Sequence, residues 1–455
     1  MKMKKKKWVG VILSLTLVIS LVVIGGVPSP ALAKGTPSAI KIVVFGPMKI
    51  PLGQHQWHGA EIGAEEINAK GGISIKGKKV PIELIKVDDN CFGSVADAST
   101  AMVRAITRLK ADFLLGGYTT EATIPQMEIA MDHKKIFMAI GTNSTIIGDK
   151  VQENYARYKY AFHNQCFSAR VESGYYMPLW CEKVAKSVRK GLGWPADKTL
   201  KVAVIAEKAA WSNFFVDEFE KPGTYSPFGG EWMSKLNIEL VGVWRPARMA
   251  TNVTAELTAI NGKKPHLVAV FTTGPVGVSV SKQLRELEIP ALPFACNISA
   301  MNLKHWDITG GGCEGLSMFS PYARCGLGEK TISFFDKFEA KVKQWPIYTA
   351  ATYDALYMIQ NAIEKTGSLD PDVLVPVFEK AELSLSLGKC AFNKKHEAKY
   401  GRKWIPQPYV QWQAGKLVSV WPDGGTSIFD SDWKGYRPEG TADFLLPSWF
   451  IKHWK

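Results

Sequence analysis

Residues 59–73 read Gly59-Ala60-Glu61-Ile62-Gly63-Ala64-Glu65-Glu66-Ile67-Asn68-Ala69-Lys70-Gly71-Gly72-Ile73, and this is the most informative stretch of the chain. Small side chains recur at helical spacing on one face of it, at Ala60, Gly63 and Ala64, so residues 57–69 are predicted to form a helix. Such a face lets a helix lie close to a sheet, and Gly71-Gly72 supplies the left-handed residues that end the helix. The pattern predicts a helix packed on a sheet.

Apolar runs of strand length alternate along the chain with amphipathic segments of helix length. The predicted strands are 40–45, 80–87, 111–116, 136–140, 200–206, 238–243 and 266–271. The predicted helices are 57–69, 94–109, 121–133, 170–190, 212–235 and 276–287. This alternation indicates an α/β fold with parallel sheets covered by helices on both faces. Such sheets bind ligands at the carboxyl ends of their strands.

The N-terminal segment has the features of an export signal. Residues 2–7 are rich in lysine, residues 8–27 are nearly all apolar, and Ala31-Leu32-Ala33 is a small-x-small cleavage site. We therefore expect residues 1–33 to be a signal peptide of the Sec route. An uncleaved membrane anchor is the alternative, but glycines and prolines interrupt the apolar run just before the cleavage site. No cysteine follows the run, so we expect no lipid anchor.

Charge and cysteine content narrow the function classes. The formal net charge of +14 is dispersed rather than gathered into a basic arm or stripe, so we do not expect a nucleic-acid partner. No two cysteines are spaced C-x-x-C, which argues against a thioredoxin-type motif and a zinc ribbon. Cys313 and Cys325 could close a short loop, but the sequence leaves the pairing open. The seven cysteines are Cys91, Cys166, Cys181, Cys296, Cys313, Cys325 and Cys390.

The stretch at 59–73 resembles the first helix of the type I periplasmic solute-binding proteins, the branched-chain amino acid and amide receptors of ABC importers. The resemblance continues at Ala351-Thr352-Tyr353-Asp354-Ala355 and Ala362-Ile363-Glu364-Lys365, within predicted helices at 330–344 and 348–366. It ends at a strand pair over 408–422, which the residues themselves predict as a hairpin around Ala414-Gly415. The aromatic tail at 425–455 lies beyond the resemblance and has no expected function.

The resemblance implies two doubly wound, Rossmann-like lobes joined by three hinge crossings. The crossings are expected near 160–163, near 319–324 and just before Trp404. The expected lobe boundaries are 34–162 with 321–397 for lobe 1, and 163–320 with 398–455 for lobe 2. Some relatives bridge the Cys91 position to the position of Thr119, so the resemblance implies that this disulfide is absent here.

Two strand-to-helix turns of lobe 1 are the expected carboxylate site. Residues 116–123 follow a predicted strand, and a helix N-terminus presents unpaired N–H groups to an anion. By resemblance Thr120 is the hydroxyl ligand; the alternative is that Thr119 or Thr120 merely caps the helix. At the second turn Asn143 stands in the position of a ligand-binding threonine and can donate from its amide, or the turn is a plain loop. The candidate residues of both turns are Tyr118, Thr119, Thr120, Glu121, Gly141, Thr142 and Asn143.

Lobe 2 is expected to contribute an aromatic side chain. By resemblance Trp211 stands where relatives place a tyrosine that closes over the ligand, and an indole suits a cationic group; core packing is the alternative. Phe271 and Thr272, at the next strand end, are further candidates. Leu52 belongs to the turn that opens the cleft in relatives. The pair His55 and His58 has metal-like spacing but no third ligand in view, so we expect surface histidines.

One position departs from the pattern of amino-acid receptors. By resemblance, the acid that faces the ligand ammonium is replaced by Ile298. A buried ammonium without a counter-charge is costly, so either another acid such as Glu121 replaces it or the ligand has no amine. The expected ligand is a small carboxylate, either an apolar or aromatic amino acid or a related amine-free acid.

The resemblance predicts a periplasmic, monomeric receptor that delivers its ligand to an ABC permease of the inner membrane. A ligand-binding partner of a membrane sensor or chemoreceptor is the alternative. An α/β enzyme would need a nucleophile elbow, a Walker loop, a dinucleotide G-x-G-x-x-G or an H-E-x-x-H helix. None is present, since Tyr400 stands where His396-Glu397 would require a second histidine. We therefore predict no catalytic activity, no cofactor and no metal.

Overall fold

Strand β1 (Ile40–Gly46) is flanked by two parallel neighbours in a five-stranded sheet of order β4-β1-β5-β6-β7, in which every pairing is parallel. The computed structural model describes residues 37–164 and 168–455, so the predicted signal peptide and Cys166 lie outside the described residues. The other strands of this sheet are β4 (Ile82–Asp88), β5 (Phe113–Gly116), β6 (Phe137–Ala139) and β7 (Ala161–His163).

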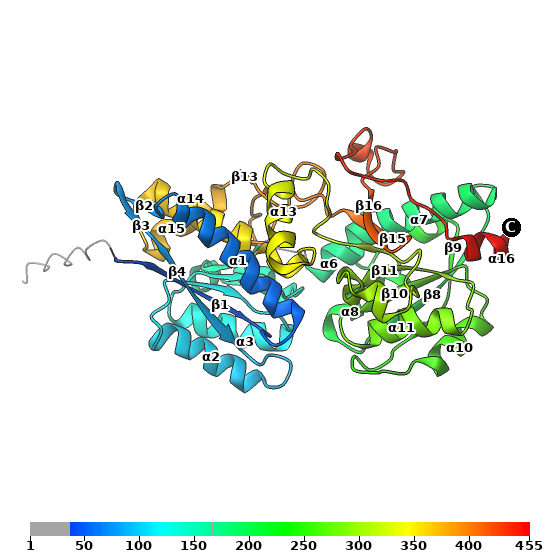
Figure 1. Cartoon of the computed structure of the whole chain (residues 1–455), viewed down its shortest axis with the longest axis horizontal. Helices are drawn as coiled ribbons and strands as arrows, with labels where there is room; N and C mark the ends of the chain where they lie inside the picture. The colour runs from blue at the N-terminus through cyan, green and yellow to red at the C-terminus, as the bar shows by residue number, and fades with distance from the viewer. Residues whose placement is uncertain (1–36, 165–167) are drawn as a thin grey trace, which may run out of the picture. The chain divides into compact units, whose positions relative to one another are not determined.

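Helices cover both faces of this first sheet (Figure 1). Those of the first lobe are α1 (Pro51–Ala69), α2 (Val95–Thr107), α3 (Thr120–Asp132), α4 (Ile146–Glu153), α5 (Tyr155–Tyr158), α13 (Thr331–Val342), η3 (Tyr348–Ala351), α14 (Thr352–Thr366) and α15 (Pro371–Lys380). The glycines of α1 allow a close approach to other helical segments. A Cβ on Gly59 would lie 2.2 Å from the Ala350 oxygen, and one on Gly63 would meet Leu356 at 3.1 Å. The face of small residues on α1, which was predicted to lie on a sheet, therefore also packs against η3 and α14.

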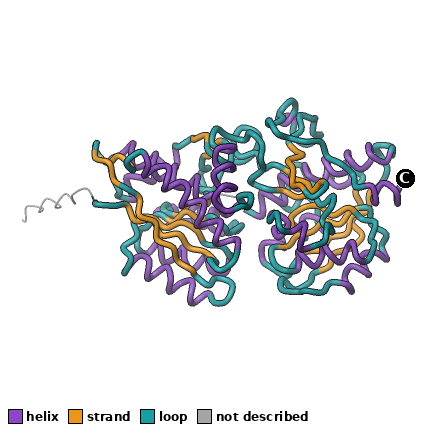
Figure 2. Tube along the Cα trace, viewed as in Figure 1, coloured by secondary structure: helices purple, strands orange, loops and turns teal. Residues whose placement is uncertain are grey.

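The second sheet has seven strands in the order β16-β15-β12-β11-β10-β8-β9, and only β15 and β16 run antiparallel to their neighbours. Figure 2 shows the strands of both sheets between helices. The strands are β8 (Leu200–Ala206), β9 (Ile238–Trp244), β10 (Leu267–Thr272), β11 (Leu292–Asn297), β12 (Ser317–Phe319), β15 (Tyr409–Gln413) and β16 (Lys416–Trp421). Ala414 and Gly415 both have positive φ (48° and 78°), as a tight hairpin turn requires. The predicted hairpin is confirmed.

Successive side chains of a strand point to opposite faces of the second sheet, so the second lobe has a separate hydrophobic cluster on each face. Val202 and Val204 of β8 belong to the main core cluster, whereas Ala203 and Ile205 belong to a separate cluster with residues of α10 and α11. The helical segments are α6 (Ala169–Val171), η1 (Glu172–Tyr176), α7 (Met177–Leu192), α8 (Ala210–Glu220), α9 (Trp232–Lys235), α10 (Thr254–Gly262), α11 (Val276–Glu286), η2 (Ile298–Met301), α12 (His305–Ile308), η4 (Ser431–Trp433) and α16 (Ser448–Trp454). Apolar burial on both faces is typical of parallel sheets.

Two predicted helices differ from the structure. The predicted helix at 212–235 is two helices, because Pro222-Gly223 (φ 88° at the glycine) interrupts it. The predicted helix at 170–190 contains the π-helical turn η1, which lies between α6 and α7. In each case a local backbone feature decides the outcome, and the period of apolar residues does not report it.

The fold class prediction is confirmed, since two doubly wound α/β lobes are present. The lobe boundaries stay a prediction. Smaller two-stranded sheets pair β2 (Ile73–Ile75) with β3 (Lys78–Val80) and β13 (Leu383–Ser384) with β14 (Lys389–Cys390). Within the described residues, no helix is both long and apolar enough to cross a membrane. The six described cysteines are buried free thiols, Cys313 and Cys325 included.

Candidate functional site

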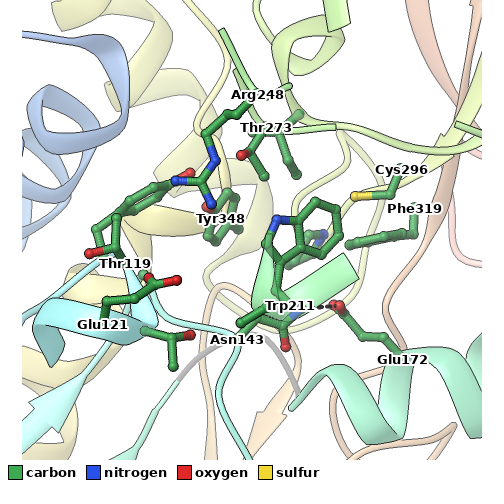
Figure 3. A pocket seen from close by; sticks show the side chains of 16 residues that line it. Thr119, Glu121, Asn143, Glu172, Trp211, Arg248, Thr273, Cys296, Phe319 and Tyr348 are labelled. Carbon is green, nitrogen blue, oxygen red and sulfur yellow. Dashed lines mark hydrogen bonds between the residues drawn. The ribbon is translucent and has the colours of Figure 1, made fainter. Parts of the chain in front are cut away.

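A cavity lies where strands of both sheets end (Figure 3). Its empty space is about 610 Å³, part of it open to solvent. Its walls follow the carboxyl ends of β5, β6, β8, β9, β10 and β11, the edge at which doubly wound sheets bind ligands. The lining residues are Tyr118, Thr119, Thr120, Glu121, Gly141, Asn143, Glu172, Ala210, Trp211, Arg248, Thr273, Cys296, Ile298, Phe319, Pro321 and Tyr348.

The N-terminal turn of α3 forms one wall. Thr119 is the N-cap residue, yet its hydroxyl makes no capping bond and instead donates to the Cys91 carbonyl at 3.2 Å. The hydroxyl of Thr120 lies 3.4 Å from that of Thr142. The side-chain capping alternative therefore does not hold for Thr119. The first backbone N–H groups of α3 remain available to an anion.

The contact between Thr119 and Cys91 also bears on the disulfide that the resemblance implied to be absent. The two positions are adjacent in space, and Cys91 is a free thiol. Here the hydrogen bond from the Thr119 hydroxyl to the Cys91 carbonyl joins the two positions in place of a disulfide.

The turn after β6 forms the adjoining wall. A Cβ on Gly141 would lie 2.8 Å from the Tyr118 ring and 2.6 Å from the Gly117 oxygen, so the close approach of the two turns requires glycine. Thr142 is buried and does not line the cavity; its carbonyl oxygen lies 2.7 Å from His163 Nε2. Asn143 does line the cavity and donates from Nδ2 to Glu172 Oε2 at 2.5 Å.

Trp211, at the start of α8, lines the cavity from the second lobe. Its indole N–H donates to Glu207 Oε1 at 2.9 Å, and its ring makes an edge contact with Phe215. The side chain is partly buried, so it packs on the core with one side and faces the cavity with the other. Trp211 therefore takes part in core packing and also lines the cavity, and its role in ligand binding stays a prediction.

Arg248 is a cavity residue that the sequence reasoning missed. It lies in the loop after β9, and its Nε donates to the buried carboxylate of Glu207 at 3.1 Å. Its guanidinium carbon lies 5.9 Å from the ring centroid of Phe92, which belongs to the first lobe. Figure 3 shows the guanidinium on the side of the cavity nearest Thr119. A basic residue just after a predicted strand end was the available sequence signal.

Glu172 is the second residue that was missed. Its side chain is fully buried at the start of η1, where its oxygens accept from Asn143 Nδ2 and, at 2.9 Å, from Gln407 Nε2. Burial raises the pKa of Glu172 to about 8, against the opposing effect of the two amide donors. No sequence signal marks Glu172, because the residue lies inside an amphipathic segment.

The remaining sequence candidates lie outside this cavity. Phe271 is buried in the lobe core and stacks on Phe215 with ring centroids 4.4 Å apart. Thr272 is buried and donates to Asn297 Oδ1 at 3.1 Å. Leu52 lines a wider groove that continues outward from the cavity and shares Arg248, Thr273 and Ile298 with it.

The two histidines with metal-like spacing are engaged separately. His55 is buried, which lowers its pKa to about 3, and its Nδ1 accepts from the Ile347 N–H. It is therefore not the surface histidine that the sequence suggested. His58 lies 3.0 Å from Glu61 Oε2.

The cavity has a distinct distribution of charge. Arg248 and the α3 N-terminus favour an anion on one side, where the carboxylate of Glu121 also lies, and Glu172 lies on the other. Trp211, Ile298 and Phe319 supply apolar surface. A small carboxylate with an apolar body matches these walls. Among the described residues, no cluster of His, Cys, Asp or Glu side chains could hold a metal ion.

Comparisons with known proteins agree with this geometry. The family model described as "Periplasmic binding protein" matches residues 42–172 and 226–405. The Leu/Ile/Val-binding protein BraC3 of Rhizobium johnstonii is 22% identical over 409 residues, covering 87% of this chain and 97% of the relative.

Two solved structures show a similar fold. One is the branched-chain amino acid substrate-binding protein LivJ of Streptococcus pneumoniae with isoleucine, with a TM-score of 0.65, 17% identity, and coverage of 83% of this chain and 97% of that one. The other is a solute-binding protein of an ABC transporter from R. palustris with benzoate, with a TM-score of 0.65, 17% identity, and coverage of 84% and 95%.

Proposed function

This chain belongs to the periplasmic binding protein family, whose members are binding proteins rather than enzymes, and on that premise we propose that it is the solute receptor of an ABC importer. Its ligand is a small carboxylate with an apolar body. Tyr118, Thr119, Thr120, Asn143 and Trp211 are its ligand-binding residues, together with Arg248.

The observation that carries this proposal is that the guanidinium of Arg248 and the N-terminal turn of α3 lie on the same side of the cavity. Its guanidinium is oriented by Glu207 and reaches the first lobe at Phe92. A planar guanidinium recognises a carboxylate with two parallel hydrogen bonds. The α3 turn offers backbone N–H groups and the hydroxyl of Thr120 to the same anion. The carboxylate therefore makes contacts with both lobes at once.

The apolar walls suit the rest of such a ligand. Trp211 and Phe319 provide aromatic surface, and Ile298 adds a hydrocarbon side chain at the position where the resemblance implies an acid in amino-acid receptors. The isoleucine of the LivJ structure and the benzoate of the R. palustris structure are both carboxylates with an apolar body. They support the same class of ligand for this chain.

The proposed mechanism is closure of two lobes on the ligand. Trp211 and Arg248 contact a ligand whose carboxylate is bound to the first lobe only when the two lobes come together. The ligand therefore stabilises the closed form. The monomer then presents that form to a permease of the inner membrane. The periplasm is the proposed location, reached through the signal peptide expected at 1–33.

Thermal unfolding of ligand-free mature protein tests this function. The panel contains branched-chain and aromatic amino acids, their deaminated acids, and amides that lack a carboxylate. A ligand at 100 times its dissociation constant adds about 2.7 kcal/mol to the free energy of unfolding, a shift of several degrees. Carboxylates are expected to stabilise the protein and the amides are not. No response to any carboxylate would contradict the proposal.

A further inference from the structure

The acidic side of the cavity carries an inference about which carboxylates bind. We propose that Glu172 and the side-chain oxygen of Asn143 are the acceptors for an ammonium group on the ligand. This rests on the proposed function, because it concerns the same cavity. Ile298 supplies no acid, so Glu172 takes the role that Glu121 was expected to fill.

The buried acceptors around Glu172 outnumber the donors. Asn143 and Gln407 each give an amide N–H to one oxygen of Glu172. The amide oxygens of both residues, Asn143 Oδ1 and Gln407 Oε1, are buried and have no hydrogen-bond partner among the described residues. Buried polar groups are rarely left unpaired, and each exception asks for a missing partner. An ammonium brings three donors and a positive charge.

The backbone holds Glu172 in a fixed position at the cavity wall. It opens the π-helical turn η1, and such turns are frequent at functional sites. Gln407 has a left-handed backbone (φ 45°), a conformation that non-glycine residues adopt at a cost. The N–H of Ala169 donates to the Asn143 carbonyl at 3.0 Å, which ties the two sides of the acceptor group together.

No cation of the described residues neutralises Glu172, which forms no salt bridge within 4.0 Å among them. The titratable groups that face it are the Cys296 thiol and the Tyr176 hydroxyl, and burial raises the pKa of both well above their usual values. Arg248 and Glu121 are the other charged residues of the cavity. Among Glu172, Cys296 and Tyr176, Glu172 is therefore the group that changes its protonation state near neutral pH.

Ligand binding is then coupled to a proton. At pH 7 a carboxyl group with a pKa of about 8 is about nine-tenths protonated. An ammonium placed against it favours the carboxylate, so the proton leaves Glu172 for solvent while the ligand keeps its own. Each ammonium ligand is expected to release about 0.9 proton at pH 7. Its affinity rises with pH toward 8, whereas that of an amine-free acid does not.

Calorimetric titration at pH 7 with defined pairs of compounds tests the proposal. The probes are leucine, isoleucine, valine and phenylalanine, each beside the acid in which hydrogen replaces the ammonium. The proteins are the wild type, Glu172→Gln, Glu121→Gln and, as a control for loss of a buried carboxylate, Glu218→Gln. Glu218 is fully buried in lobe 2 and does not line the cavity. Its carboxylate accepts hydrogen bonds from Gly223, Tyr225 and Trp232.

The expected result is selective. Glu172→Gln weakens binding of the amino acids by about 30-fold or more, the cost of removing one partner from a buried charge pair, and leaves the amine-free acids unchanged. Glu218→Gln changes neither class. Selective loss in Glu121→Gln with none in Glu172→Gln would overturn the assignment, as would equal binding of amino acids and amine-free acids by the wild type. Failure of every probe to bind would instead overturn the carboxylate function itself.

A second measurement uses only the wild-type protein, so it does not depend on whether the variants fold. The binding enthalpy is measured in buffers of different ionisation enthalpy, which gives the number of protons released. Amino acids that bind without releasing a proton would overturn the proposal, and release of about 0.9 proton supports it.

Discussion

Glu207 is the residue on which the second-lobe wall of the cavity depends. Its carboxylate is fully buried and accepts hydrogen bonds from the indole of Trp211, the guanidinium of Arg248, and the backbone and hydroxyl of Thr273. These four donors satisfy the buried charge and lose their own freedom to rotate. The indole and the guanidinium are therefore already oriented before a ligand arrives, which lowers the entropic cost of binding.

Arg248→Gln is expected to weaken carboxylate binding by about 10- to 100-fold, the range for a lost hydrogen bond to a charged group. The reason is that Gln keeps a donor to Glu207 but loses the positive charge. Titration of the best ligand of the panel measures the effect. Lys208→Gln removes an exposed positive charge nearby and serves as the control. An equal loss in both variants would show that Arg248 acts only through the general charge of the lobe.

Thr272 and Thr120 form a matched pair for separating stability from binding. Thr272→Val removes a buried donor to Asn297 and is expected to lower the free energy of unfolding by about 1–3 kcal/mol without changing affinity. Thr120→Val, at the cavity wall, is expected to reduce affinity by about tenfold with little change in stability. Denaturant titration and calorimetry measure the two effects. The reverse pattern would restore Thr272 as a ligand residue.

Elements differ in how well their sequence predicts them. Strand β8 and helix α1 were expected because apolar spacing reports burial, and the β15–β16 hairpin because Ala414-Gly415 suits its turn. The π-helical turn η1 was not, since a single wide turn is too short for apolar spacing to distinguish it from the helix around it. The turns after β5 and β6 were predicted because glycines and threonines follow the two strands directly. Arg248 and Glu172 were missed because long-range contacts select them.

The C-terminal tail is part of the second lobe at the scale of its elements. The N–H of Ala442 donates to the Ser419 carbonyl on β16, so the tail occupies an otherwise open sheet edge. Trp433 packs on Trp421 with ring centroids 4.4 Å apart, and Phe450 of α16 is fully buried. No tail residue lines the cavity. The tail therefore packs on the second lobe and does not form part of the cavity wall.

Phe450→Ala is expected to destabilise the protein by about 3–5 kcal/mol, the usual cost of removing a buried phenylalanine ring. Leu445→Ala changes an exposed side chain of the same tail and is expected to stay within about 0.5 kcal/mol of the wild type. Chemical denaturation gives both values. Equal stability of the two variants would mean that α16 contributes nothing to the lobe.

Across the whole molecule, four buried histidines link stability to pH. Burial lowers the pKa of His55 to about 3 and those of His163, His266 and His305 to about 4, from an ordinary value of 6.5. Above pH 6.5 these groups are neutral in both the folded and the unfolded chain. As the pH falls from 6.5 toward 4, only the unfolded chain takes up the protons, so stability is lost in that window. Glu172 acts in the opposite sense, because its raised pKa keeps it protonated in the folded protein while the unfolded chain ionises.

His305→Gln isolates one of these contributions. The stability difference between wild type and variant is expected to shift in favour of the variant by up to about 1.4 kcal/mol for each pH unit below 6.5. Urea denaturation between pH 7 and pH 4.5 measures it, with the exposed His453→Gln as control. Parallel pH profiles for wild type and His305→Gln would contradict the expected coupling.

The attachment of α16 has a practical consequence for instrument design. The indole of Trp454 donates to the Pro290 carbonyl at 2.5 Å, just before β11, and its ring packs on His266, just before β10. The last residues of the chain are therefore held at the amino ends of the strands, whereas the cavity opens at their carboxyl ends. A linker fused to Lys455 would therefore leave the protein on the side away from the cavity, so that a protein tethered to a bead or an electrode through it keeps the cavity exposed to solvent.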